Sequence, residues 1–248
     1  MNAIKKKIHQ LKKAVRLLPT SIYRNGLYCG VAATIEHESI LKKLNCNTVI
    51  DIGANKGQFA LMARSCFPDA HIYSFEPLDS AANIYELLFD KDANSNLHRY
   101  AIGSVETYMD LHVSKRNDSS SLLPIGELQT SIFPNTDEIE LQSVKVVPLK
   151  KLIHDDDLLS PSLLKIDVQG FEMDVLIGCD ELLEQFNYIY IECSYIELYK
   201  GQYLANDIIK YLDQNSFKLM GVYNTFYDYN SIAVQSDFLF YHNRLEDK

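Results

Sequence analysis

Short apolar segments alternate with longer amphipathic ones from residue 48 onward. Five of the apolar segments have the length and continuous apolar character of buried strands. They are TVIDI from Thr48, HIYSF from His71, LHRYAI from Leu97, LLKID from Leu163 and YIYIE from Tyr188. Helices are predicted at 58–67, 79–88 and about 204–212, and two more strands near Phe217 and Phe238. This alternation predicts an α/β fold with a seven-stranded, mostly parallel sheet and helices on both faces.

A long insertion separates the third strand from the fourth. It runs from residue 103 to about 160, and its alternating segments MDLHV and VKVV predict an antiparallel β-ribbon. The stretch DSSSLLPIGELQTSIFPN between them is interpreted as a loop. Loops of this length in a compact domain are usually functional, so we expect the insertion to contribute to a site.

The N-terminal residues form a separate pattern. Apolar residues recur at spacings of four and three from Ile4 to Leu18, which predicts an amphipathic helix that ends before Pro19. Its outer face is basic. We favour packing of its apolar stripe on the main domain over contact with an anionic membrane surface. The chain is accordingly divided into a basic helical arm, 1–35, and a main domain, 36–248.

Composition and charge narrow the class of protein. The chain is 47% hydrophobic and 23% charged, as in ordinary soluble domains, and no apolar run is long enough to span a membrane. The net charge is −9, although the residues before Glu36 carry only basic charges. An acidic body repels a phosphate backbone, so nucleic-acid binding is not expected. Five scattered cysteines without a C-x-x-C pair indicate reduced thiols, and we expect a cytoplasmic protein without a signal peptide.

The clearest motif follows the first strand. VIDIGANKGQFA, from Val49, joins a strand to a helix through a loop that contains Gly53 and Gly57. Such a loop brings backbone N–H groups close to a ligand at the carboxyl edge of the sheet. The dinucleotide fingerprint G-x-G-x-x-G is incomplete because Asn55 replaces its middle glycine, and Asp51 would repel a pyrophosphate. An NAD-linked oxidoreductase is therefore the less favoured alternative.

A second acid follows the second strand, Glu76 within SFEP. S-adenosylmethionine has no phosphate, and its ammonium group would be attracted to Asp51. Its two ribose hydroxyls could both bind the Glu76 carboxylate. The two acids therefore predict S-adenosylmethionine as the cofactor. Helix capping by Asp51 and a solvated turn at Glu76 remain alternative explanations.

Several further segments resemble one family, the FkbM-type S-adenosylmethionine-dependent methyltransferases. The resemblance covers roughly 48–240 and rests on VIDIGANKGQFA, SFEP, NDSSSL from Asn117, LLKIDVQGFEMDVLIG from Leu163, IYIECS from Ile189 and YNTFYD from Tyr223. It implies a Rossmann-like class I methyltransferase fold and O-methylation, often of sugars or sugar-bearing products. Carried over by motif, the residues that would line the cofactor site are Asp51, Gly53, Asn55, Gly57 and Glu76.

Two more acids, Asp167 and Glu192, follow the fourth and fifth strands and are predicted to be catalytic. They could act on the acceptor hydroxyl as a base, or hold Mg²⁺ that acidifies it. The metal is not favoured, because Cys193 follows where metal-dependent catechol-type enzymes carry an amide. The structural alternatives are a helix cap at Asp167 and a salt bridge between Glu192 and Lys165.

Other polar residues are candidates for cofactor or acceptor contacts. Glu172 begins the helix that follows the fourth strand, where an acid is favoured by the helix dipole alone. Three serines, among them Ser120, could bind the cofactor carboxylate or the acceptor; the set is Ser119, Ser120 and Ser121. Between the last two strands, aromatic and polar residues suit a sugar: Tyr223, Asn224, Tyr227 and Asp228. None of the seven histidines is singled out as a base.

The favoured function is therefore O-methylation of a hydroxyl on a sugar, glycan, glycolipid or sugar-bearing metabolite. A non-catalytic scaffold that binds the cofactor is a further alternative to the oxidoreductase.

Overall fold

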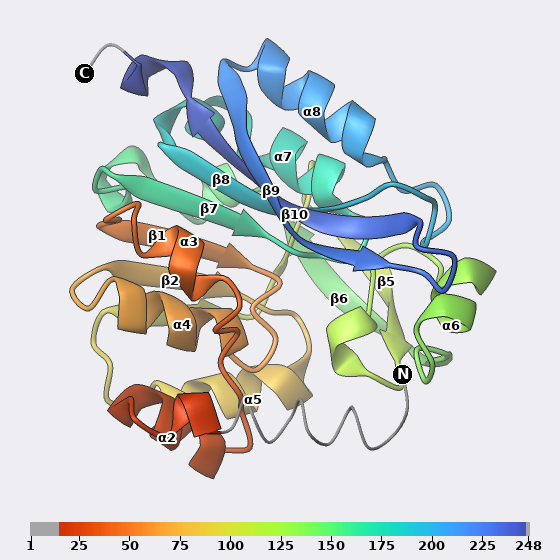
Figure 1. Ribbon diagram of the computed structural model, residues 1–248, viewed down its shortest axis with the longest axis horizontal. Coiled ribbons are helices and arrows are strands. Elements are labelled where there is room, and N and C mark those ends of the chain that lie inside the picture. Colours follow the sequence, from red (N-terminus) through yellow and green to blue (C-terminus); the bar gives the residue numbers. More distant parts are fainter. Residues whose placement is uncertain (1–14, 247–248) are drawn as a thin grey trace.

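A seven-stranded sheet forms the centre of the computed structural model, which describes residues 15–246 (Figure 1). Its strand order is β3-β2-β1-β7-β8-β10-β9. The strands are β1 Thr48–Ile52, β2 His71–Phe75, β3 Ser95–His98, β7 Ser162–Ile166, β8 Tyr188–Ser194, β9 Phe217–Tyr227 and β10 Ala233–His242. Neighbours from β3 to β8 are parallel, and β10 runs antiparallel to β8 and β9. The predicted fold class is confirmed.

Helices cover both faces of this sheet (Figure 1). One face carries α2 Ser21–Tyr28, α3 Glu38–Leu41, α4 Gln58–Cys66 and α5 Asp79–Leu88, and the other carries α7 Glu172–Cys179 and α8 Ala205–Gln214. Side chains alternate between the faces along each strand. In β1, Val49 packs in the cluster with α4, whereas Ile50 packs in the cluster with α7. Strands buried on both faces explain the continuous apolar runs in the sequence.

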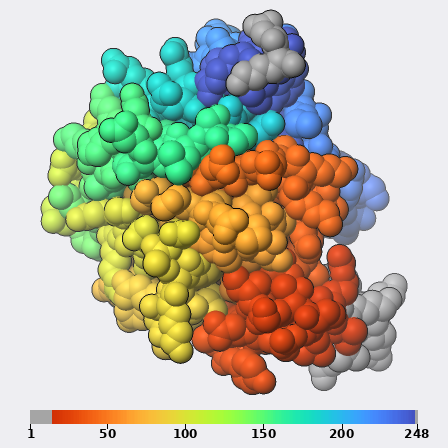
Figure 2. Space-filling model, turned by 90° about the vertical axis from the view of Figure 1, so that its left-hand side faces the viewer, coloured from red at the N-terminus to blue at the C-terminus, as the bar shows by residue number. Residues whose placement is uncertain are grey.

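The segment before β1 packs on the main domain. Leu17 and Tyr23 are buried in the same cluster as α4, and Gly26 lets α2 approach the Leu61 side chain closely. In the space-filling view this segment, in red, lies against the orange and yellow parts of the surface (Figure 2). Most of the predicted amphipathic helix falls in residues 1–14, outside the described part of the chain. Within residues 15–246, no helix is long and apolar enough to cross a bilayer.

The insertion forms a small sheet of its own beside the carboxyl ends of the parallel strands (Figure 1). The strand β6 (Glu138–Val147) pairs antiparallel with β5 (Thr107–Ser114) and parallel with β4 (Ala101–Ile102). The expected ribbon is therefore present. The remaining elements of the described chain are short: α6 Glu127–Ile132 and the 3₁₀ turns η1 Asn117–Ser119, η2 Leu149–Lys151, η3 Asp155–Asp157, η4 Asp180–Gln185 and η5 Asn243–Leu245.

Three details differ from the sequence prediction. The strand expected from Leu97 to Ile102 is broken at Arg99, whose guanidinium binds Glu86 on α5, so that β3 and β4 belong to different sheets. The expected loop after β5 contains η1 and α6. Asn224 and its tyrosine neighbours lie within β9 rather than between the last two strands, because β9 extends to Tyr227.

Candidate active site

A cavity of about 420 Å³ opens at the carboxyl ends of β1, β2, β7 and β8. This is the position at which open α/β sheets bind their ligands, and the volume suits a small molecule. The insertion forms part of its wall, through residues 116–122 and Gln129 of α6. The insertion therefore lies where it can contribute to a site, as its length predicted.

The glycine loop lines the cavity next to β1. Gly53 and Asn55 line the cavity, and both have a left-handed backbone, with φ of 77° and 46°. A Cβ on Gly53 would lie 1.9 Å from the carbonyl oxygen of Asp167, so no larger residue fits there without moving the loop. Gly57 has a different role and does not line the cavity. It begins α4 against the rings of Tyr85 and Phe89.

Asp51 lies behind the cavity wall, fully buried. Strand register places it beside Lys165, whose Nζ forms an ion pair with Asp51 Oδ1 at 2.9 Å and donates to the carbonyl oxygens of Gly53 and Ile52. Burial raises the pKa of Asp51, whereas Lys165 opposes that rise. Burial lowers the pKa of Lys165, but the carboxylates of Asp51, Asp167 and Glu192 together outweigh this, so the net shift is upward and the amine stays charged. Asp51 does not line the cavity, so the predicted direct contact with a ligand is not available to it. Lys165 lines the cavity at this place instead.

Glu76 lines the cavity beyond the end of β2. Its two carboxylate oxygens accept hydrogen bonds from the backbone N–H groups of Asn55 (2.9 Å) and Leu78 (2.8 Å). Burial raises the pKa of Glu76 to about 7, although both hydrogen bonds act to lower it. Each oxygen keeps a second lone pair, so the carboxylate can also accept two hydrogen bonds from a bound diol.

The serines of the insertion mainly make hydrogen bonds that stabilise the wall of the cavity. Ser120 lines the cavity and its hydroxyl accepts from the backbone N–H of Ser114 at 3.1 Å. Ser121 donates to the carbonyl oxygen of Gln169 at 2.6 Å, which ties the insertion to the loop after β7. The carbonyl oxygen of Ser119 lies 3.1 Å from the hydroxyl oxygen of Tyr199.

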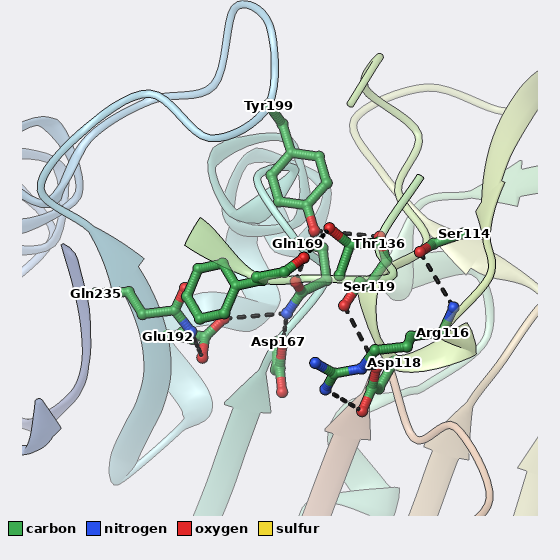
Figure 3. Close-up of polar contacts among 11 residues, drawn as sticks. Ser114, Arg116, Asp118, Ser119, Thr136, Asp167, Gln169, Glu192, Tyr199 and Gln235 are labelled. Carbon is green, nitrogen blue, oxygen red and sulfur yellow. Dashed lines mark hydrogen bonds and ion pairs between the residues drawn. The ribbon is translucent and has the colours of Figure 1, made fainter. Parts of the chain in front are cut away.

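Asp167 and Glu192 meet through a shared amide (Figure 3). Gln169 Nε2 donates to Asp167 Oδ1 at 2.7 Å and to Glu192 Oε2 at 3.0 Å. The hydroxyl of Tyr199 donates to Gln169 Oε1 at 2.8 Å, which fixes the orientation of the amide. Gln235 Nε2 donates to the other oxygen of Glu192 at 2.6 Å. Burial, followed by the charge of Asp167, raises the pKa of Glu192 well above its ordinary range.

This arrangement does not fit a divalent ion between the two acids. The space between the carboxylates is spanned by an N–H donor, whereas a metal requires oxygen or nitrogen lone pairs there. Among residues 15–246 there is no group of three or more acids, histidines and cysteines placed to hold a metal. The structural alternatives also differ from what is found. The N-cap of α7 is Phe171, not Asp167, and Lys165 pairs with Asp51 rather than with Glu192.

Glu172 supports the loop between β7 and α7. Its Oε1 accepts from the backbone N–H groups of Gly170 (2.9 Å) and Val168 (3.3 Å), and burial raises its pKa to about 7. Of the late candidates, Asn224 lines the cavity, whereas Asp228 Oδ1 accepts two backbone N–H bonds within the β9–β10 turn.

A polar cluster lies at the end of the cavity beyond Glu192, and of its members the sequence indicated only Asn224 besides Glu192. His37 Nδ1 lies 2.8 Å from Tyr190 Oη, 3.0 Å from Asn224 Nδ2 and 3.3 Å from Asp237 Oδ2. Asn224 Nδ2 donates to Asp237 Oδ2 at 2.8 Å. Asp237 is the direct cross-strand neighbour of Glu192. All five residues line the same cavity.

Comparison with known proteins identifies the family. The model of the methyltransferase FkbM domain matches residues 51–219. The chain is 31% identical over 182 residues to the 2-O-methyltransferase NoeI of Sinorhizobium fredii, covering 69% of this chain and 72% of that protein. It is 26% identical over 181 residues to Methyltransferase 1 of Beauveria bassiana, covering 63% and 72%. Precorrin-6y C5,15-methyltransferase from Geobacter metallireducens superposes with a TM-score of 0.43 at 11% identity, over 82% of this chain and 86% of that one.

The matched region contains the glycine loop, Glu76, Asp167 and Glu192. Fold and site therefore define an S-adenosylmethionine-dependent methyltransferase. The chain belongs to the FkbM methyltransferase family. The prediction made from its motifs is confirmed at this level.

Proposed function

We propose that this enzyme transfers a methyl group from S-adenosylmethionine to a hydroxyl of a sugar, glycan or sugar-bearing acceptor in the cytoplasm. The observation that carries the proposal is the pair of carboxylates, Asp167 and Glu192, held at one end of the cavity by Gln169. Carboxylates and amides are the groups that bind adjacent hydroxyls through several hydrogen bonds. The name of the relative NoeI, a 2-O-methyltransferase, also supports a hydroxyl acceptor.

The residues present fit the cofactor in the half of the cavity next to β1 and β2. Glu76 has free lone pairs for two ribose hydroxyls, and Gly53 and Asn55 bring the backbone of the glycine loop to the same place. Lys165 holds the Gly53 carbonyl and neutralises Asp51, so that the loop keeps its shape. When bound, S-adenosylmethionine supplies an activated methyl group.

In the other half, Asp167 and Glu192 orient the acceptor. Each has an oxygen that can accept a hydrogen bond from an acceptor hydroxyl, and Gln169 keeps the two carboxylates from moving apart. Methyl transfer from a sulfonium needs an oxygen in line with the methyl group and a site without competing water. Positioning of the hydroxyl is therefore the main contribution of these two acids.

The test uses S-adenosylmethionine labelled in its methyl group with a panel of oligosaccharides, glycolipids and methyl glycosides. We expect label in a product that survives mild alkali, as an ether does and an ester does not, and turnover that is unchanged in EDTA. Asp167→Asn should bind S-adenosylhomocysteine with nearly unchanged affinity and lose turnover. The control is Asp174→Asn, because Asp174 on α7 lies outside the cavity.

Two results would contradict the proposal. One is wild-type enzyme that labels no hydroxyl in the panel. The other is a melting temperature that NAD raises and S-adenosylhomocysteine does not, since a ligand that binds the folded state stabilises it. Activity that EDTA abolishes and Mg²⁺ restores would show that a metal displaces the amide of Gln169.

A further inference from the structure

The cluster at the far end of the cavity joins three segments that are distant in the sequence. His37 precedes α3, Tyr190 lies on β8, and Asp237 lies on β10. Tyr190 and Glu192 are two positions apart on β8, and Asp237 faces Glu192 across the strands, so all three side chains lie on one face of the sheet. The cluster is therefore an extension of the wall that contains Glu192.

The proton of His37 is placed by its neighbours. Nδ1 faces two oxygen atoms, the carboxylate of Asp237 and the hydroxyl of Tyr190, and either can accept a hydrogen bond. The nearby amide of Asn224 already donates to Asp237. A proton on Nδ1 is therefore favoured, and in the neutral ring the lone pair then belongs to Nε2. Within residues 15–246, all hydrogen bonds of the His37 ring are made by Nδ1.

The two acids nearer the cofactor are engaged by side-chain donors. Both oxygens of Glu192 already accept a side-chain hydrogen bond, from Gln169 and Gln235, and Asp167 accepts one from Gln169. These bonds hold the two carboxylates where they can orient a hydroxyl. Within residues 15–246, Nε2 of His37 makes no such bond, so its lone pair is available to accept a proton.

We infer that His37 is the general base of the methyl transfer and that Asp237 is the residue that positions it, an inference that rests on the proposed function. Nε2 takes the proton of the acceptor hydroxyl as the oxygen forms its bond to the methyl carbon. The carbon–sulfur bond breaks and its electron pair stays on sulfur, which becomes the neutral thioether of S-adenosylhomocysteine. The imidazolium is stabilised by the Asp237 carboxylate until it releases the proton to solvent.

The experiment compares His37→Gln and Asp237→Asn with a matched control. His112 also pairs with a carboxylate, Nδ1 to Glu138 Oε2 at 2.6 Å, but it lies on the outer ribbon away from the cavity, so His112→Gln should behave as wild type. The acceptor is the panel member that wild-type enzyme labels best. The readouts are kcat and KM for labelled-methyl transfer, the S-adenosylhomocysteine Kd by calorimetry, and the melting temperature.

We expect kcat to fall about 100-fold in His37→Gln, because a positioned general base contributes on the order of 10²- to 10⁴-fold. KM and the S-adenosylhomocysteine Kd should change less than about threefold, and Asp237→Asn should lower kcat by about tenfold.

Three outcomes would overturn the inference alone, with wild-type activity intact. They are a His37→Gln enzyme with normal kcat, loss of rate in Glu192→Gln but not in His37→Gln, and loss of cofactor affinity in proportion to loss of rate. The last would make His37 a cofactor contact. Wild-type enzyme that labels no hydroxyl would instead overturn the proposed function, and the inference with it.

Discussion

The two halves of the cavity are held by different parts of the chain. Next to β1 and β2, the carboxylate of Glu76 is held by backbone N–H groups, and the N–H of Gly53 donates to the carbonyl oxygen of Phe75 on β2 at 3.1 Å. Beyond β7, Glu192 and Asp237 are held by the side-chain amides of Gln169, Gln235 and Asn224. The first half is therefore determined by the fold itself, and the second by individual side chains that substitution can change.

The family match covers one half of the cavity completely and the other only in part. The matched region, residues 51–219, contains the whole backbone-held half. Of the side-chain-held half it contains Asp167, Gln169 and Glu192. The residues of that half that lie outside it are His37, Asn224, Gln235 and Asp237. Family members that share a cofactor but differ in their acceptors would produce this pattern. The following variants test whether a change in one half of the cavity leaves the function of the other half unaffected.

The largest effect is expected from Gly53→Ala. The new Cβ would lie 1.9 Å from the carbonyl oxygen of Asp167, and alanine disfavours the left-handed φ of 77°. Left-handed strain and overpacking together should lower the free energy of unfolding by about 2–5 kcal/mol. The displaced loop should lower S-adenosylhomocysteine affinity by about 100-fold, or roughly 3 kcal/mol. Calorimetric titration and chemical denaturation measure the two effects.

Gly30→Ala is the control that separates the effect of left-handed backbone strain from the effect of the steric clash in Gly53→Ala. Gly30 also has a left-handed φ, 73°, but a Cβ there meets no atom within 4 Å. It should lose only about 1–2 kcal/mol of stability and keep its cofactor affinity. Equal binding by both alanine variants would show that the glycine loop does not hold the cofactor.

Glu76→Ala should have the next largest effect. It removes a charged acceptor for the ribose and leaves the N–H groups of Asn55 and Leu78 without a partner. Hydrogen bonds to charged groups contribute about 1.5–3 kcal/mol, so S-adenosylhomocysteine should bind about 10- to 150-fold more weakly. The control, Glu86→Ala, removes an exposed carboxylate of α5 that binds Arg99 and should leave the Kd unchanged. Unchanged affinity in Glu76→Ala would remove this residue from the cofactor site.

Gln169→Leu tests the half that is held by side chains. Without the shared N–H donor, Asp167 and Glu192 lose the bond that keeps both carboxylates in place. An unsatisfied charged group costs on the order of 1–3 kcal/mol, so kcat should fall by about tenfold while the S-adenosylhomocysteine Kd changes little. The control is Gln214→Leu at the exposed end of α8. If Kd changed as much as kcat, the two halves would not be independent.

The smallest effect is a pH dependence of cofactor binding. Burial raises the pKa of Glu76 to about 7, and the ionised carboxylate is the better acceptor for ribose hydroxyls. Binding therefore favours loss of the proton, so affinity should rise as pH increases through 7 and level off above it. Between pH 8 and pH 6 we expect a loss of about fivefold in S-adenosylhomocysteine affinity. Calorimetry of Glu76→Gln, which cannot ionise at this position, should give a flat profile, and a slope that persisted there would assign the dependence to another group.

The sequence was sufficient for most elements and for bringing Gly53, Asn55 and Glu76 to one cavity, because both depend on local patterns. Strands and helices follow the apolar periodicity, and Gly53, Asn55 and Glu76 lie within 24 positions of one another. One long-range contact could also have been found. Aligning TVIDI with LLKID as neighbouring parallel strands puts Asp51 close to Lys165, and the register Asp51↔Lys165 is the one observed.

In the other half, Asp167, Glu192 and Asn224 were indicated by the sequence, but the residues around them could not be predicted in the same way. His37 and Asp237 are 200 positions apart, and their contact depends on the packing of the segment before α3 on β8 and β10. Asp237 looks like an ordinary solvent-facing residue of an alternating strand. The role of Gln169 depends on its left-handed backbone, with φ of 56°. No local sequence motif predicts this conformation for a glutamine.

The pairing of β9 with β10 slips out of regular register on both sides of Gln235, between Ala233 and Gln235 and again between Gln235 and Asp237. Irregularities of this kind absorb an extra residue locally and turn the side chains beside it. Because β9 is the edge strand and β10 pairs regularly with β8, a single-codon insertion or deletion in β9 would change the side chains around Asn224 and leave the β8–β10 pairing aligned. The same event in β1 would turn its buried side chains to the opposite face. If the acceptor binds as proposed, a gain or loss of one codon in β9 would alter acceptor contacts while the Gly53 and Glu76 side of the cavity is inherited unchanged.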